Sequence, residues 1–142
     1  MIRPFEPGDA GAILSIWREA SAVAHPFLSE AFLQEAEAAI RDIYLPMAET
    51  WVAEEAGQAV GFIALIGDVV GGFFVRPAWQ GRGHGRALMD HAVDLRQQLQ
   101  LEVFRDNLAG RRFYRAYGFA ETGEAMDQAS GHPVVTMCYP AR

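Results

Sequence analysis

Hydrophobic positions repeat along this chain with helical spacing in some stretches and strand spacing in others, and the order of the two patterns predicts the elements. A short apolar run over residues 2–5 predicts a strand. Two helical patterns follow, with Asp9 and Ser29 placed to cap them and Pro46 placed to end the second. Their apolar positions are Ile13, Leu14, Trp17, Ala20 and Ala24 in the first, and Phe32, Leu33, Ala36, Ile40 and Ile43 in the second.

Strand patterns dominate the middle and the end of the chain. They cover residues 51–53, 60–66, 69–75, 99–104, 121–126 and 134–139, with helical patterns at 87–95 and 108–117. Turn residues separate the first three of these strands, which predicts an antiparallel meander. The helix at 87–95 crosses over to the strand at 99–104, which makes that strand parallel to its predecessor. The sequence therefore predicts an α+β fold, a mixed, mostly antiparallel sheet flanked by about four helices.

Composition narrows the class of protein. The 142 residues predict a single domain over residues 1–142, and the net charge of −6 argues against nucleic acid or an anionic membrane as the main partner. No apolar run approaches the roughly 20 residues that span a bilayer, and the first residues lack a signal-peptide core. Cys138 is the only cysteine, which excludes an internal disulfide and favours a reducing compartment. We expect a cytoplasmic protein.

A glycine-rich turn between the strand at 69–75 and the helix at 87–95 carries the first chemical signal. Glycines 81, 83 and 85 alternate with Gln80, Arg82 and His84, and Arg86 follows. The free N–H groups and positive dipole at a helix start bind phosphate, and glycines let an anion approach them. The spacing fits neither a Walker loop nor the dinucleotide fingerprint. The alternative is a turn that needs glycine only for its backbone dihedral angles.

Two motifs resemble the GNAT-type N-acetyltransferase superfamily. The first is Gln80-x-x-Gly83-x-Gly85, which resembles that superfamily's pyrophosphate turn. The second resembles N-x-x-A-x-x-x-F-Y-x-x-x-G-F and matches at Asn107, Phe113, Tyr114, Gly118 and Phe119, with Gly110 where alanine is usual. The resemblance covers essentially the whole chain. It implies a splayed central pair of parallel strands and direct transfer of an acetyl group from acetyl-CoA to an amine in a ternary complex.

The resemblance also implies which residues hold acetyl-CoA. The strand end at Phe74 and Val75 is expected to pair with pantetheine beside a bulge, with the Val75 N–H facing the thioester oxygen. Asn107 is expected to reach the pantetheine, although its position also suits a helix N-cap. The pyrophosphate is assigned to the turn residues Gln80, Gly81, Arg82, Gly83, His84, Gly85 and Arg86.

Three residues are candidates for proton transfer. Tyr114 matches the tyrosine that many members place beside the cofactor sulfur, and as a general acid it would protonate the thiolate. A phenol pKa near 10 against a thiol pKa near 8.5 makes full transfer uphill by roughly 2 kcal/mol. Tyr114 can instead be a core residue, and Tyr117 is its competitor. For the base, Glu102 points away from Leu101 and Val103, and His25 has an ordinary pKa that suits neutral pH.

The amine acceptor is predicted by class only. Residues 25–30 and 128–133 are expected to shape its site, and the acceptor is a small-molecule or peptide amine. The histidines and the cysteine show no metal-ligand spacing, so no metal is expected. A homodimer is compatible with the sequence. Two alternatives remain open: a non-catalytic acyl-CoA sensor, for which Tyr114 and Glu102 would be dispensable, and an interaction module.

Overall fold

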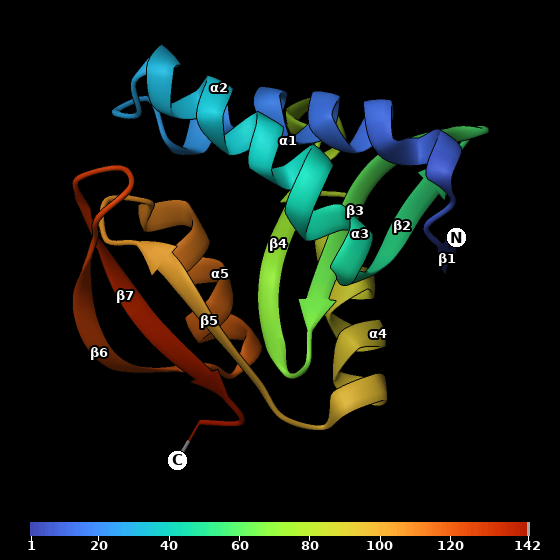
Figure 1. Ribbon diagram of the computed structural model, residues 1–142. Helices are drawn as coiled ribbons and strands as arrows, with labels where there is room; N and C mark the ends of the chain where they lie inside the picture. The colour runs from blue at the N-terminus through green and yellow to red at the C-terminus, as the bar shows by residue number, and fades with distance from the viewer. Residues whose placement is uncertain (142) are drawn as a thin grey trace.

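The computed structural model describes residues 1–141 and shows one seven-stranded mixed sheet with helices on both faces (Figure 1). The strands are β1 (Ile2–Pro4), β2 (Glu49–Glu55), β3 (Gln58–Ile66), β4 (Val69–Val75), β5 (Leu99–Phe104), β6 (Ala120–Asp127) and β7 (His132–Tyr139). Their order across the sheet is β1-β2-β3-β4-β5-β7-β6. The predicted α+β fold is confirmed, including the antiparallel meander of β2, β3 and β4.

The helices cover the two faces of the sheet unequally (Figure 1). They are α1 (Ala10–Ala24), α2 (Glu30–Ala39), a π-helical turn (Ile40–Tyr44), α3 (Leu45–Met47), α4 (His84–Arg96) and α5 (Leu108–Tyr117), with 3-10 turns at Pro7–Asp9 and Pro77–Trp79. One hydrophobic cluster joins α1 to the sheet, and a second lies on the α4 side. Successive side chains of a strand point to opposite faces of the sheet and so contribute to both clusters. Val52 belongs to the first cluster and Ala53 to the second. Among residues 1–141, no helix is long and apolar enough to cross a bilayer.

The central strands β4 and β5 are parallel but barely paired. Their register contains a single Cα pair, Val69 with Gln100, whereas β5 pairs with β7 from Leu99 to Phe104. Beyond Val69 the edge of β4 that faces β5 therefore runs without a partner strand. The predicted splayed pair is confirmed, and it divides the sheet at its centre (Figure 1).

The helical stretch that begins with α2 ends at Met47, one residue after Pro46, close to where the sequence predicted its end. Helical backbone continues from α2 through the π-helical turn to Met47, and Leu45 N donates to Ile40 O across five residues. Pro46 follows Leu45 just after the π-helical turn within this continuous stretch, and the helical backbone ends one residue after it. A local change of helical pitch thus accommodates a residue that would break a regular helix.

The two predicted caps differ in outcome. The Ser29 hydroxyl accepts from Phe32 N at 3.1 Å, so this cap of α2 is confirmed. Asp9 occupies the N-cap position of α1 without bonding to it. Its carboxylate instead accepts from the Arg3 guanidinium at 2.8 and 2.9 Å and from Glu6 N at 2.8 Å. A charge-assisted pair to β1 outcompetes the cap.

Candidate active site

The unpaired edge of β4 forms one wall of a cleft in the centre of the sheet. Arg76 N donates to Val60 O at 2.7 Å, so the backbone of residue 76 faces β3. Alternation then turns the backbone groups of Phe74 towards β3 and those of Phe73 and Val75 towards the cleft. The sequence predicted that the backbone of Phe74 and Val75 pairs with pantetheine. In the structure the N–H groups that face the cleft are those of Phe73 and Val75.

The bulge expected beside Val75 lies elsewhere. Val75 pairs regularly with Gly61, and the register of β3 and β4 breaks at Gly71, between the pairs Leu65–Val70 and Ala64–Gly72. Glycine marks the position because a bulge kinks the strand and leaves its extra residue without a partner.

The glycine-rich turn ends β4 and starts α4. Gln80 Nε2 donates to Val75 O at 3.0 Å, which fastens the turn to the edge of the cleft. Gly81 and Gly83 have φ of 79° and 87°, and a Cβ on either would meet nothing within 4 Å. Gly83 is the N-cap of α4, whose first N–H groups have no helical partner. The turn therefore combines free donors, left-handed glycines and open space, which fits a phosphate.

A carboxylate from the end of β2 faces this turn. Glu55 Oε1 lies 2.8 Å from His84 Nε2, without hydrogen-bond alignment, and its Oε2 lies 3.9 Å from Arg82 Nη1. The Arg82 guanidinium also stacks over Trp79 at 4.7 Å. The His84 side chain is 11% exposed. Glu55 thus lies beside two of the residues assigned to phosphate, which sequence spacing did not reveal.

Tyr114 on α5 lies beneath the cleft edge of β4. Its ring packs against Phe73 at 6.0 Å and against Phe119 at 5.5 Å. Among residues 1–141 no group hydrogen-bonds to its hydroxyl, and burial raises the pKa of this phenol well above its ordinary value. The side chain is therefore a neutral, protonated donor next to Phe73.

Tyr117, the competing tyrosine, is occupied elsewhere. Its hydroxyl donates to Asp90 Oδ1 at 2.6 Å, and the Arg86 guanidinium lies over its ring at 5.5 Å. Burial and the Asp90 carboxylate raise the pKa of Tyr117 above its ordinary value. These contacts join α5 to α4, and the hydroxyl proton is used in the bond to Asp90.

Glu102 lies on the opposite face of the sheet from Tyr114, in the second wall of the cleft. Leu101 and Val103 are buried on the α4 side, and Glu102 is exposed between them, as alternation predicts. It borders a cavity of about 400 Å³ whose lining includes Gly71 of β4 and Thr136 of β7. We call this the polar cavity.

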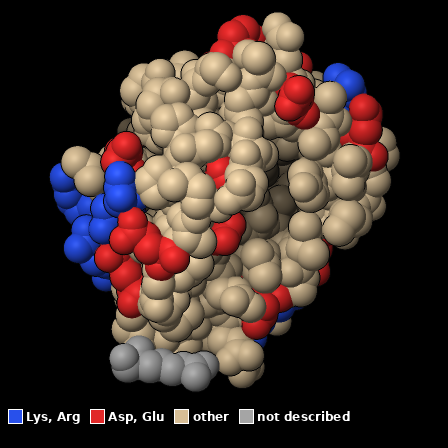
Figure 2. Space-filling view, turned by 60° about the vertical axis from the view of Figure 1, so that its left-hand side comes forward, with Lys and Arg blue, Asp and Glu red and all other residues tan. Residues whose placement is uncertain are grey.

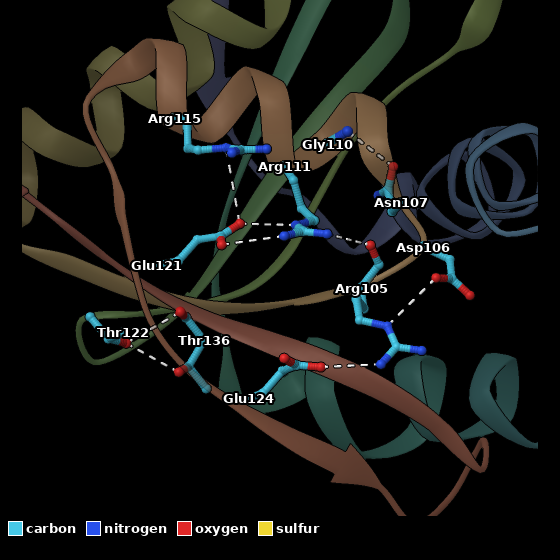
Figure 3. Close-up of polar contacts among 10 residues, drawn as sticks. All are labelled: Arg105, Asp106, Asn107, Gly110, Arg111, Arg115, Glu121, Thr122, Glu124 and Thr136. Carbon is cyan, nitrogen blue, oxygen red and sulfur yellow. Dashed lines mark hydrogen bonds and ion pairs between the residues drawn. The ribbon is translucent and has the colours of Figure 1, made fainter.

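Hydroxyl and thiol groups complete the polar cavity. Thr122 Oγ1 lies 3.1 Å from Thr136 Oγ1 and donates to Thr136 O at 3.2 Å (Figure 3). Cys138 and Gln100 also contribute to its lining. Figure 2 shows the face of the molecule brought forward from the left of Figure 1, with a hollow bordered mainly by uncharged side chains and basic side chains gathered at one edge.

The buried side chain of His25 lies at the wide end of the cleft. Its ring contacts Phe74 of β4 at 6.3 Å and Phe104 of β5 at 4.9 Å, and the residue is 8% exposed. Burial lowers the pKa of His25 to about 4. The expectation of a base with an ordinary pKa is therefore wrong, because the hydrophobic surroundings disfavour the imidazolium.

Asn107 contacts His25 and caps α5 at the same time. Its Oδ1 accepts from Gly110 N at 3.0 Å (Figure 3), and its Nδ2 lies 3.2 Å from His25 Nε2. The N-cap role considered from sequence is present in the structure. The amide is thus already bonded at both ends within the described chain.

The two segments expected to shape the acceptor site meet in space. Phe27, in the turn between α1 and α2, lies 4.8 Å from the ring of His132 at the start of β7. Phe104 of β5 contacts Phe27 at 5.5 Å. Two arginines of α5 pair with β6: Arg111 binds Glu121 at 2.9 Å, and Arg115 approaches the same carboxylate at 4.0 Å (Figure 3). Within residues 1–141, no cluster of His, Cys, Asp or Glu is arranged to hold a metal.

Comparison with known proteins identifies the family. The model of the acetyltransferase (GNAT) domain matches residues 46–121. The chain belongs to this family, and the protein is an acyltransferase.

The relatives resemble the chain over nearly its whole length. It is 33% identical to the peptidyl-lysine N-acetyltransferase YiaC of Escherichia coli, over 99% of this chain and 97% of that protein. Among solved structures, apo YjaB of Escherichia coli is 30% identical with a TM-score of 0.89, covering 100% of this chain and 98% of that one. The PaiA N-acetyltransferase of Thermoplasma acidophilum, solved with coenzyme A, shares the fold with a TM-score of 0.80 at 17% identity, covering 97% and 96%.

Proposed function

We propose that this protein transfers the acetyl group of acetyl-CoA to the ε-amine of a peptide lysine, by direct attack of the amine on the thioester within a ternary complex. The observation that carries the proposal is the unpaired edge of β4, which leads from the glycine turn at Gln80–Gly85 to the polar cavity at Gly71. The acceptor class rests on the name of the relative YiaC and on the net charge of −6, which favours cationic peptides.

One side of the site suits the acyl donor. Gly81, Gly83 and the N-terminus of α4 provide N–H groups for the pyrophosphate, and Arg86 adds positive charge. The N–H groups of Val75 and Phe73 hold an extended arm in the manner of an added strand. We assign the polarising contact to the thioester oxygen to this edge, with Val75 as the residue named by the family resemblance.

The other side suits the acceptor. The Glu102 carboxylate attracts the lysine ammonium and takes its proton, directly or through a water, so that a neutral amine attacks the carbonyl carbon. As the C–N bond forms, the nitrogen releases its second proton to water, the C–S bond breaks and the sulfur leaves as a thiolate. Tyr114 donates its proton or a hydrogen bond to that thiolate. Because burial raises the pKa of Tyr114, stabilisation by a hydrogen bond is favoured over complete proton transfer.

Calorimetric titration with acetyl-CoA, CoA and ATP tests the donor side. Binding of the first two without ATP supports the proposal, and no binding of acetyl-CoA contradicts it. Thiol release is then measured with a lysine peptide and with the same peptide carrying N-ε-acetyl-lysine. Release with the first alone supports a lysine acceptor. Binding without release from any amine would favour the sensor alternative.

A further inference from the structure

A second cavity lies on the α1 face of the sheet and is almost entirely apolar. Its volume is about 210 Å³. Phe62, Gly72 and Phe74 of β3 and β4 form its floor, and Trp17, Ile40 and Leu45 form its roof. We call it the apolar cavity. It is separate from the hydrogen-bonding groups of the polar cavity and contains nothing that could compensate a buried charge.

Two consecutive glycines of β4 lie where the apolar cavity adjoins the polar cavity. A Cβ on Gly72 would lie 3.2 Å from the Phe62 ring, and a Cβ on Gly71 would lie 3.6 Å from Ile66. Both glycines line the apolar cavity, and Gly71 also lines the polar cavity. The bulge at Gly71 is therefore the point where the two cavities and the unpaired edge of β4 meet.

The π-helical turn shapes the roof. Ile40 and Tyr44, its first and last residues, line the apolar cavity, and Leu45 follows directly. A wider helical turn at this place brings side chains over the cavity, and such turns recur at functional sites. The departure from regular helix near Pro46 thus coincides with the cavity.

We propose that the apolar cavity receives the acyl chain of donors longer than acetyl, so that the protein uses linear acyl-CoA thioesters up to about six carbons. The inference rests on the proposed function. The size follows from comparison with an apolar cavity of about 150 Å³, which accommodates a six-carbon ring. The bonds made and broken are those of acetyl transfer, with a longer alkyl group on the carbonyl carbon.

The acyl chain is favoured over the acceptor as occupant by chemistry and by position. A lysine ammonium entering an apolar cavity would lose its hydration without a counter-charge, whereas Glu102 offers one in the polar cavity. Gly71 and Gly72, which line the apolar cavity, lie in β4 itself, next to Phe73, whose N–H faces the cleft. A carbonyl held by the Phe73 N–H, rather than by that of Val75, lies only one to two residues from these glycines, within reach of a short acyl chain.

Calorimetry with acetyl-, propionyl-, butyryl- and hexanoyl-CoA tests the proposal without turnover. Each added methylene that leaves water should lower the Kd roughly threefold to fourfold, and a dodecanoyl chain should gain nothing more. With one fixed peptide acceptor, kcat/KM should rise in the same order. A Kd that is equal or weaker for the longer donors overturns the proposal. Failure to bind acetyl-CoA at all would instead overturn the proposed function.

Filling the cavity provides the matched test. Ala48→Leu places a branched side chain into the lining, and Gly72→Ala adds a methyl group 3.2 Å from the Phe62 ring in the cavity floor. Both should reduce the butyryl-to-acetyl ratio of affinities towards one. The control is Ala116→Leu, at an exposed position of α5, which should keep the wild-type ratio. If the ratio persists in both cavity variants, or if they affect only peptides with an apolar residue beside the lysine, the acyl chain is not the occupant.

Discussion

His25 Nε2 accepts a hydrogen bond from the Asn107 side-chain amide at 3.2 Å, which links the turn after α1 to the start of α5. The direction is fixed by the other end of the amide, because Asn107 Oδ1 already accepts from Gly110 N. Nδ2 therefore faces the imidazole, and Nε2 carries no proton. Since the His25 ring also separates Phe74 from Phe104, this bond helps to set the width of the cleft.

Acid should weaken the fold through His25. Its pKa is about 4 in the folded protein and about 6.5 when unfolded, so between these values the unfolded chain binds more protons. The stabilisation is complete above pH 6.5 and is lost as the pH falls to 4, up to about 3 kcal/mol. Urea unfolding of wild type and His25→Gln measures the difference. Parallel pH profiles for the two proteins would contradict this role.

Gly110→Ala should not give the gain in stability that a glycine-to-alanine substitution in a helix normally gives. A Cβ there would lie 2.6 Å from Asn107 Nδ2, so the cap must rotate away and lose about 1 kcal/mol. This offsets the roughly 0.8 kcal/mol by which alanine favours a helix over glycine. Gly11→Ala, in the first turn of α1 with nothing within 4 Å, should show the full gain. Equal thermal stabilisation by both substitutions would mean that Asn107 moves at no cost.

Gly83→Val should abolish acetyl-CoA binding. The substitution puts a branched side chain into the open space of the turn, where the pyrophosphate is proposed to lie. Gly57→Val is the control, because Gly57 has a similar φ of 77° and equally open surroundings in the β2–β3 turn. Both variants carry comparable backbone strain. If calorimetric binding is lost in Gly83→Val alone, the loss comes from the blocked phosphate contact and not from the strained backbone dihedral angles. Retained affinity in Gly83→Val would leave the turn purely structural.

Tyr114→Phe should lower kcat by about a hundredfold with little change in acetyl-CoA affinity, as expected for loss of a donor that stabilises the departing thiolate. Tyr117→Phe removes the bond to Asp90 and should instead reduce stability by about 1 kcal/mol. Thiol release and thermal melting of the two variants distinguish a catalytic hydroxyl from a structural one. The reverse pattern would assign the acid to Tyr117.

Glu55→Gln should tighten acetyl-CoA binding. The carboxylate lies beside Arg82 and His84 at the proposed phosphate turn, and the substitution removes a negative charge that pairs with Arg82 and repels phosphate. Exposed pairs of this kind contribute about 0.2–1 kcal/mol, so we expect an affinity gain of up to about fivefold at low salt. The gain should shrink as ionic strength rises. Weaker binding would show that Glu55 orients the turn.

Local patterns predicted most of the architecture. Period and turn residues gave the strand order of the meander, the parallel crossover into β5 and the cap at Ser29. Each of these depends on residues adjacent in sequence. The π-helical turn at residues 40–44 could not be predicted in this way, because the change of pitch is stabilised by packing of Ile40 and Leu45 against the sheet.

The site was less accessible to sequence reasoning because it depends on contacts between distant segments. The lowered pKa of His25 arises from Phe74 and Phe104, which are 49 and 79 positions away. Glu55 reaches the glycine turn from another strand. One local signal was present: two glycines inside a strand, at 71 and 72, indicate a bulge, and they mark its position better than the family resemblance did.

The single register pair between β4 and β5 gives the sheet a mechanical consequence. Each half-sheet, β1–β4 and β5–β7, has its own ladder of hydrogen bonds, and the junction between them contributes almost none. An acyl-CoA molecule lying in the gap between β4 and β5 would pair with the sheet like an eighth strand and contact both half-sheets. At a concentration one hundred times its Kd it would add about 2.7 kcal/mol to the free energy of unfolding. The thermal stability of this protein would then rise with the concentration of its own substrate.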